Sequence, residues 1–472
     1  MGQRAVLGLS GILLAYFALR VPGLGWGLPP TTPEVRQSDL RCSYAIDEDD
    51  VLTAVSFLRP CEGKWDVRLY HWGTLHFLLL APVMKVFEAV GYLPSPWRDA
   101  YYNLAPGDFE RVYMAARLVS VLIGAVTVWL AFLLGRQWAG ETEGLLAALF
   151  LAVSPAHMLT SLQARVDMTM TVFVALTALL ALRSPGSFWM AAAAGLAVAA
   201  KHSAILQVAP IVLVAGRLRA ATAFGFGAGL LAGEPFWLVH GGEIVRQLRV
   251  NLGGKGPARA FEFAGNFVDL ARFSMGVPLA TLAVAGLRWR KEKVLLASIG
   301  GGVLVLVLMQ VVLLRLHVPL LPFLSVAAAM AVMRMGRAAA PVALIAMAFP
   351  LFACLAQLDY MRSPHPANEI LPVILKEVPP RTPIARLIAE MPPLDRRVYP
   401  MAGNPLLHRV SAPWVLLTDL AVGEYPPLPA GYDLVADRRL SRRFAWATLG
   451  EHGAPHDWKY THPSMMLYRR NR

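Results

Sequence analysis

Four consecutive acidic residues, Asp47, Glu48, Asp49 and Asp50, stand in a chain in which only 16% of residues are charged. A carboxylate can take the proton from a hydroxyl or amine as it attacks the anomeric carbon of a sugar, so Asp47 is a candidate base, with Glu48 beside it. A surface acidic run is more often simply a solvated face. The hydrophobic segment before the cluster favours the catalytic interpretation, because it would place these carboxylates at a membrane surface beside lipid headgroups.

Three basic residues, Arg165, Lys201 and Arg315, fall in short turns that the charge pattern assigns to the outer side of a membrane. Lys and Arg are normally depleted on that side. Capture of a phosphate would be a reason to keep cations there. The alternatives are that each side chain snorkels to lipid headgroups, or that Arg165 forms an ion pair with Asp167. Taken together, the three cations predict an anion site, with Asp167 as a second acid.

Two histidines and two cysteines surround the acidic cluster in sequence. His71 and His76 could join the carboxylates around a divalent metal, although no fixed ligand spacing supports such a site. Cys42 and Cys61 bracket the cluster. In an oxidising compartment, a disulfide between them would close a loop of about 20 residues and stabilise the fold by about 3 kcal/mol. This disulfide would hold the carboxylates in place.

The elements that position these residues are predicted to be membrane spans. With 56% hydrophobic residues and a mean hydropathy of +0.50, the chain is too apolar for an ordinary soluble protein. The net charge of +13 does not predict nucleic-acid binding, because the basic residues are spread over short turns and the C-terminal region. A span needs about 20 apolar residues. The sequence predicts eleven spans, the first of them uncleaved: 6–21, 112–134, 145–162, 168–182, 188–200, 205–215, 221–239, 275–287, 294–314, 317–333 and 341–358.

Basic turns give the predicted orientation, because Lys and Arg in short loops remain in the cytoplasm. Arg136 and the basic run 288–293 are therefore predicted to be cytoplasmic, and the acidic cluster to lie outside the cell membrane. A span at 75–90 would invert this pattern, so that stretch is predicted to be a juxtamembrane helix in the interface. Arg20, at the outer end of the first span, is expected to reach the headgroups.

The last part of the chain, residues 360–472, is rich in proline and arginine. Short strand-like runs at 414–417 and 465–468 predict a small α/β domain on the outer surface. The membrane domain is then residues 1–359. No catalytic motif is evident in the C-terminal domain.

Several sequence segments occur in an order that resembles a known family. They are "DE" at Asp47 and Glu48, "YHWGTLHFLLLAP", "ARLVSVLIGAVTVWLAFLLGR", "LLAALFLAVSPAHMLTSLQARVD" ending at Asp167, "GLAVAAKHSAILQVAP" and "RLHVPLLPFL". Each is loose, and their order is the specific feature. The chain resembles GT-C superfamily glycosyltransferases, close to the protein O-mannosyltransferase and aminoarabinose transferase group of family 39.

The resemblance implies an all-α polytopic membrane fold with juxtamembrane helices, and inverting transfer of a sugar from a polyprenyl-phosphate donor to an acceptor glycan, lipid or protein. Asp47 would be the base, Asp167 the second acid, and Lys201 and Arg315 would lie near the donor phosphate. Family members often carry Pro-Pro or Lys-Pro where this chain reads "HWGT". His71 is the substitute at that position.

Two other functions remain alternatives. A flippase or transporter of lipid-linked sugars would also need charges at the membrane, but such carriers usually contain internal repeats, and none is evident here. An O-antigen ligase or polysaccharide polymerase would be a different glycosyltransferase. The large first outer loop and the C-terminal domain favour an enzyme over a carrier.

Overall fold

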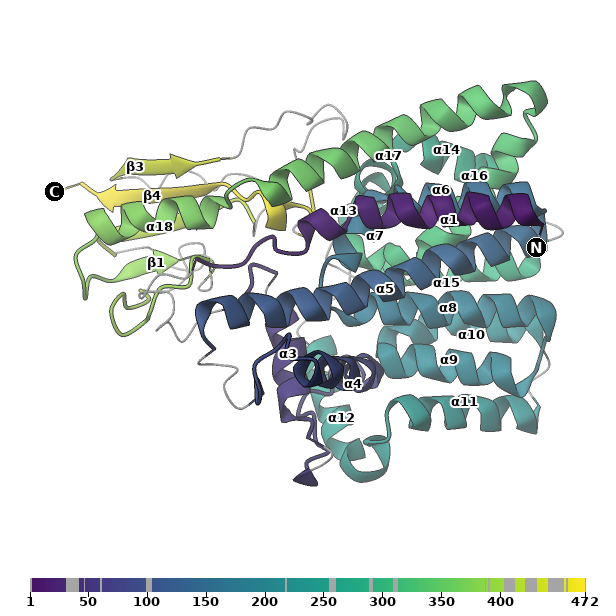
Figure 1. Ribbon diagram of the computed structural model, residues 1–472, viewed down its shortest axis with the longest axis horizontal. Helices are drawn as coiled ribbons and strands as arrows, with labels where there is room; N and C mark the ends of the chain where they lie inside the picture. The colour runs from purple at the N-terminus through teal and green to yellow at the C-terminus, as the bar shows by residue number, and fades with distance from the viewer. Residues whose placement is uncertain are drawn as a thin grey trace.

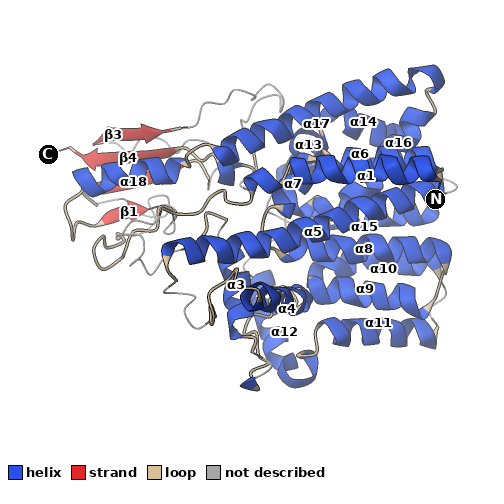
Figure 2. Cartoon of the chain, in the orientation of Figure 1, coloured by secondary structure: helices blue, strands red, loops and turns tan. Residues whose placement is uncertain are grey.

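The structure is a computed structural model of the 472-residue chain. It describes residues 2–30, 42–45, 47–59, 62–98, 104–216, 219–253, 260–287, 292–308, 313–386, 388, 391–402, 412–420, 431–439, 454–455 and 457–471. Helices form most of the described chain, and a small sheet lies near the C-terminus (Figure 2).

Most helices lie side by side in one bundle, and the sheet stands beyond one end of it (Figure 1). The helices are α1 (Gln3–Ala18), α3 (Asp47–Phe57), α4 (Leu75–Ala89), α5 (Pro106–Trp138), α6 (Glu141–Ala152), α7 (Pro155–Ser161), α8 (Val166–Arg183), α9 (Phe188–Ala200), α10 (Ile205–Ala215), α11 (Ala220–Gly233), α12 (Trp237–Gly253), α13 (Ala260–Asp269), α14 (Val277–Gly286), α15 (Lys293–Leu308), α16 (Leu321–Met333), α17 (Ala339–Arg362) and α18 (Pro366–Glu377).

Each of the eleven predicted spans overlaps an apolar helical segment, although residues 309–312 of the span 294–314 lie outside the described residues and the span 221–239 runs past the end of α11. Five segments are long and apolar enough to cross a membrane alone: Gln3–Gly23, Gly107–Trp138, Val166–Arg183, Leu314–Met333 and Gly336–Glu377. Two bent pairs, α6 with α7 and Ala264–Met275 with α14, pass the same test together. Four shorter apolar helices complete the set: Phe188–Ala200, His202–Ala215, Ala220–Gly233 and Lys293–Leu308. The predicted polytopic helical fold is confirmed.

One predicted span, 145–162, is bent, and a second bend lies at the start of the predicted span 275–287. α6 and α7 meet at an angle of 63°, where Ser154 caps α7 and Pro155 occupies its first turn. Proline cannot donate the backbone hydrogen bond that would continue α6. The second bend, of 109°, occurs at Gly276, whose φ of 81° is a left-handed conformation that glycine adopts readily. The first bend turns the chain toward the residues that form the site.

The predicted juxtamembrane helix is present as α4, Leu75–Ala89. It runs across the direction of the bundle helices and is seen nearly end-on in Figure 1. Its Lys85 and Glu88 form an ion pair at 3.0 Å. This crosswise course supports the predicted position in the interface.

Arg20 does not reach outward as predicted, because its side chain is fully buried. Its guanidinium donates to Ser161 at 2.9 Å and to the Ala152 carbonyl at 3.1 Å, and it lies 3.7 Å from the ring centroid of Tyr16. The bend between α6 and α7 exposes carbonyls that a buried donor can bind. Arg20 therefore fixes the first span to this bend instead of snorkelling to headgroups.

The C-terminal sheet has four strands in the order β1-β2-β4-β3 among the described residues. β1 (Ile384–Arg386) pairs in parallel with β2 (Trp414–Thr418), and β4 (Met465–Arg470) pairs antiparallel with both β2 and β3 (Tyr432–Arg438). The strands predicted at 414–417 and 465–468 are confirmed as β2 and β4. One continuous apolar core joins the bundle to this domain through Met361, Ile370 and Trp458. The predicted domain boundary at residue 359 falls within the last turns of α17.

Candidate functional site

Five of the predicted site residues line one pocket at the sheet end of the helix bundle. The pocket is small and partly open to solvent. Its walls are made by residues from the starts of α3 and α8, the end of α9, and the turns before α4 and α16. The lining residues are Asp47, Trp72, Arg165, Val166, Asp167, Lys201 and Arg315. Chain segments that are far apart in sequence thus bring two carboxylates and three cations together.

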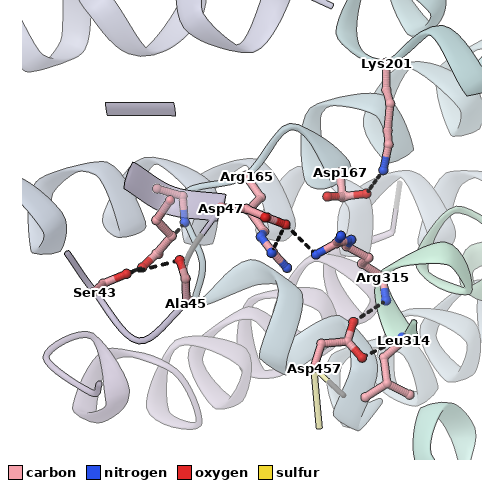
Figure 3. Close-up of polar contacts among 11 residues, drawn as sticks. Ser43, Ala45, Asp47, Arg165, Asp167, Lys201, Leu314, Arg315 and Asp457 are labelled. Atoms are coloured by element: carbon pink, nitrogen blue, oxygen red, sulfur yellow. Dashed lines mark hydrogen bonds and ion pairs between the residues drawn. The ribbon is translucent and has the colours of Figure 1, made fainter. Parts of the chain in front are cut away.

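Asp47 is the first residue of α3 and lies between two guanidiniums (Figure 3). Arg165 Nη2 and Arg315 Nη1 both donate to Asp47 Oδ2, the latter at 2.7 Å. The Asp47 side chain is 26% exposed, so solvent and small molecules can reach it. Four acids in the first turn of α3 also suit the positive N-terminal end of the helix dipole.

Asp167 and Lys201 form the second ion pair of the pocket, with Nζ donating to Oδ1 at 2.6 Å (Figure 3). Asp167 lies in the first turn of α8 and is 3% exposed, and Lys201 caps the end of α9 and is 13% exposed. The sequence had offered an ion pair between Arg165 and Asp167 as an alternative. In the structure, Arg165 pairs with Asp47 and Lys201 pairs with Asp167.

Arg165 is buried with much of its hydrogen-bonding capacity unused. Its side chain is 2% exposed, and Nε and Nη1 have no acceptor among the described residues. A guanidinium offers five N–H donors, and leaving such donors unsatisfied in a buried place is costly. The pocket lining also holds three cations and two carboxylates. An anion entering here would find both a surplus positive charge and unused donors.

Glu48 lies next to Asp47 but makes a different, closed site. Its two oxygens accept from Arg117 Nε at 2.9 Å and Nη2 at 2.6 Å, and both side chains are fully buried. Glu48 also accepts from the Ser43 hydroxyl at 2.6 Å and the Ala164 amide at 2.7 Å. Glu48 is outside the pocket lining. It fixes the turn that carries Arg165 against α3 and α5.

The turn before α4 contributes Trp72 to the pocket. His71 is absent from the pocket lining, and its ring is tilted against the Trp72 ring, with centroids 4.6 Å apart. The Trp72 carbonyl accepts from the His202 amide at 2.9 Å. Gly73 makes this contact possible, since a Cβ there would lie 2.4 Å from the Ala199 carbonyl oxygen. The turn is thereby held against the end of α9, beside Lys201.

Comparisons with known proteins agree with this architecture. A model of the family "dolichyl-phosphate-mannose-protein mannosyltransferase" matches residues 109–231. ArnT from Cupriavidus metallidurans, solved bound to undecaprenyl phosphate, has 14% sequence identity and a TM-score of 0.52, over 98% of this chain and 97% of that one. The chain has the GT-C glycosyltransferase fold. The resemblance predicted from the sequence is confirmed.

A second structural neighbour with the GT-C fold is the Archaeoglobus fulgidus oligosaccharyltransferase tethered to an acceptor peptide. It has 13% identity and a TM-score of 0.50, over 80% of this chain and 58% of that one. No curated protein matches the chain in sequence. The family model and the GT-C fold together indicate a membrane glycosyltransferase.

Two residues near the pocket were not singled out by the sequence. Asp457 accepts from the backbone amides of Leu314 and Arg315, and the Tyr460 ring lies 5.9 Å from the Arg165 guanidinium. Both belong to the C-terminal region. Their only sequence signal is an acid and an aromatic residue close together in a Pro- and Arg-rich tail, which is too common to identify a site.

The predicted metal site and disulfide, and the titration of one further acid, complete the description of this region. Among the described residues, no group of three or more His, Cys, Asp or Glu side chains is arranged to hold a metal ion. Cys42 is buried, but Cys61 lies outside the described residues, so their disulfide stays a prediction. Partial burial, together with the nearby carboxylates of Asp47 and Asp49, raises the pKa of Asp50 to about 6.

Proposed function

We propose that this chain is an inverting membrane glycosyltransferase that moves a sugar from a polyprenyl-phosphate donor to an acceptor. The observation that carries the proposal is Arg165, a buried guanidinium with two nitrogens that lack an acceptor among the described residues, in a pocket with more cations than carboxylates. A phosphate supplies both the negative charge and several acceptor oxygens. The undecaprenyl phosphate bound to ArnT, a neighbour in fold, is a lipid of this class.

The donor phosphate and Asp47 compete for the same two arginines in this account. In the absence of donor, Arg165 and Arg315 both bind Asp47 Oδ2. Phosphate oxygens that bind Arg165 and Arg315 would draw these cations from Asp47. Donor binding would therefore release the carboxylate for its role as base, so that the base becomes available only when donor is present.

The reaction itself forms one bond and breaks one. The acceptor oxygen or nitrogen attacks the anomeric carbon from the face opposite the phosphate, and its proton passes to the Asp47 carboxylate. The bond between the anomeric carbon and the phosphate oxygen breaks, and its electron pair leaves with the polyprenyl phosphate. Arg165, Lys201 and Arg315 line the pocket where this growing negative charge would be stabilised. One displacement inverts the anomeric configuration.

Location follows from the charge pattern of the turns. The pocket residues share one end of the bundle, and basic turns such as the one containing Arg136 lie at the other end, where α5 meets α6. Applying the rule that short basic loops remain cytoplasmic, we infer that the pocket and the C-terminal domain face outward from the cell membrane. The acceptor would be a glycan, lipid or protein on that side.

The test is transfer by the purified full-length protein in proteoliposomes, with a polyprenyl-phosphate sugar that is radiolabelled in the sugar. Release of free polyprenyl phosphate is followed together with movement of label into a membrane acceptor fraction. We expect transfer by the wild type and by Asp49→Asn, and loss of transfer in Asp47→Asn. Asp49 is the matched control because it lies in the same turn of α3 but outside the pocket lining.

Two results would contradict the proposal. Equal transfer by Asp47→Asn and the wild type would remove the proposed base. Movement of intact labelled donor across the bilayer without transfer would instead identify a flippase of lipid-linked sugars.

A further inference from the structure

A segment of the C-terminal domain, residues 457–464, reaches the pocket end of the bundle. Lys459 donates to Asp419, which follows β2, at 3.3 Å, and both side chains are buried. The Thr461 hydroxyl donates to Gln357 of α17 at 2.7 Å. The segment is therefore tied to the sheet on one side and to a bundle helix on the other.

Asp457 holds the backbone of the turn that carries Arg315. Its Oδ1 accepts from the Leu314 amide at 2.9 Å and its Oδ2 from the Arg315 amide at 3.1 Å (Figure 3). These amides begin the short helical turn Leu314–Leu316, whose first N–H groups have no partner within the turn. Asp457 is 4% exposed, so water competes little for its two charge-assisted bonds.

The position of this turn determines where the Arg315 guanidinium lies. Arg315 donates to Asp47 at 2.7 Å and lines the pocket. A shift of its backbone would move the guanidinium relative to a bound phosphate, and small displacements of a binding group can cost much of its effect. Asp457 thus acts on the pocket through Arg315, without lining the pocket itself.

The other arginine that binds Asp47 is also contacted from the C-terminal segment. The Tyr460 ring centroid lies 5.9 Å from the Arg165 guanidinium carbon, within the range of a cation–π contact. Tyr460 is 3% exposed, and its carbonyl accepts from His365 Nε2 at 2.9 Å. The same short segment therefore touches both arginines of the proposed phosphate site.

We propose that the C-terminal segment completes the donor-phosphate site, with Asp457 as a positioning residue for Arg315. This inference rests on the proposed function, because it assigns the phosphate of the same lipid donor to this pocket. If Asp457 served only to dock the C-terminal domain, any contact with the bundle would suffice. Instead, its two oxygens bind consecutive amides of the turn that carries Arg315, a cation of the pocket.

A matched control is available in the same domain. Asp395 is 7% exposed and accepts from the Arg397 amide at 2.8 Å, outside the pocket lining. Asp395→Asn and Asp457→Asn each remove one buried negative charge that binds a backbone amide. A general loss of stability in the C-terminal domain would appear in both variants, because among the described residues the Asp395 carboxylate binds only the neighbouring Arg397.

The experiment measures binding of sugar-free polyprenyl phosphate to the purified full-length protein, followed by KM and kcat for transfer. Asp457→Asn should weaken lipid-phosphate binding and raise the donor KM by about tenfold, the loss expected for one charge-assisted hydrogen bond, with kcat little changed. Asp395→Asn should leave both binding and KM unchanged. In an Arg315→Gln background, Asp457→Asn should have no further effect on binding.

A further variant addresses folding. Asp457→Glu keeps the charge for docking but lengthens the side chain, so it should also weaken binding; binding equal to wild type by both Asp457 variants would overturn the inference. The same conclusion follows if Asp395→Asn weakens binding as much as Asp457→Asn does. If the wild type binds polyprenyl phosphate but transfers no sugar, only the proposed reaction is contradicted. If the wild type does not bind polyprenyl phosphate, the proposed reaction and the proposed role of the C-terminal segment are both contradicted.

Discussion

Two buried arginines near the start of α3 differ in how fully they are paired. Arg117 uses all three guanidinium nitrogens, because Glu48 accepts from two and the carbonyls of Leu24 and Trp26 accept from the third. Arg165 donates from Nη2 to Asp47, and its other two nitrogens have no acceptor among the described residues. The two carboxylates are neighbours in sequence and therefore point to different sides of one helix.

This difference separates a structural ion pair from a proposed binding site. Glu48 and Arg117 are both fully buried and satisfied, so neither can bind a ligand without losing a native contact. Asp47 is 26% exposed and shares the pocket with a surplus of cations. How completely each buried charge is paired, rather than its burial or its sign, indicates which of the two regions could bind a ligand and perform chemistry.

The largest expected effect on activity is at Asp47. Removing a general base commonly slows a reaction by roughly 10²–10⁴-fold, so Asp47→Asn should lower kcat for sugar transfer by that order. Its thermal stability should fall less than that of Glu48→Gln, because the Asp47 carboxylate is 26% exposed whereas the Glu48 carboxylate is fully buried. Initial rates with labelled donor and a melting curve on the same sample measure both quantities. If Asp47→Asn lowered the melting temperature strongly and left kcat unchanged, Asp47 would have a structural role, as proposed for Glu48, and would not be the base.

The opposite pattern is expected at Glu48. Glu48→Gln leaves Arg117 buried without a charged partner, which typically costs about 3–5 kcal/mol of stability. Glu62→Gln is the control, because Glu62 is 50% exposed in its pair with Arg59 and surface pairs contribute only about 0–1 kcal/mol. Unfolding by heat in detergent compares the two variants. Equal melting temperatures would contradict the closed, structural role of Glu48.

Substitutions at Arg165 and Arg117 should have different effects, the first on donor binding and the second on stability. Arg165→Lys keeps the charge beside Asp47 but removes the donors offered to a phosphate, so the donor KM should rise roughly 10- to 100-fold. Arg117→Lys should lower the melting temperature and leave the donor KM of the folded protein unchanged. If Arg117→Lys raised KM as strongly as Arg165→Lys, the distinction between the two regions would fail.

The smallest expected effect is a pH dependence at Asp50. Its pKa is raised to about 6 from 3.8, so the folded state loses stability relative to the unfolded state as pH rises from about 4 to about 6. Asp50→Asn removes this loss. The variant should melt at a higher temperature than wild type near pH 8 and show little difference near pH 4. An equal difference at both values would show that Asp50 does not titrate in this range.

The sequence predicted the helical framework well because hydropathy and the basic turns constrain it independently. The same reasoning placed Asp47, Arg165, Asp167, Lys201 and Arg315 on one side of the membrane, and they line one pocket. It did not predict the bend at Pro155, since the apolar run continues through that proline.

The partners of the charged side chains were harder to predict from the sequence than the side of the membrane on which they lie. Arg117 lies inside the second predicted span, where an ionisable residue needs a partner, but its pair with Glu48 was not predicted. Which of four consecutive acids would supply the partner depends on how α3 is rotated against α5. Asp457 lies more than 140 residues from Arg315 in sequence, so only the tertiary structure brings them together.

The most direct test of the central claim is a structure of the protein with polyprenyl phosphate bound, obtained by electron cryo-microscopy. We expect phosphate density within hydrogen-bonding distance, about 3 Å, of Arg165 Nε or Nη1, with Arg315 turned from Asp47 toward the phosphate and the Glu48–Arg117 pair unchanged. Phosphate bound elsewhere, with Asp47 still held by both arginines, would contradict the claim that this pocket is the donor site.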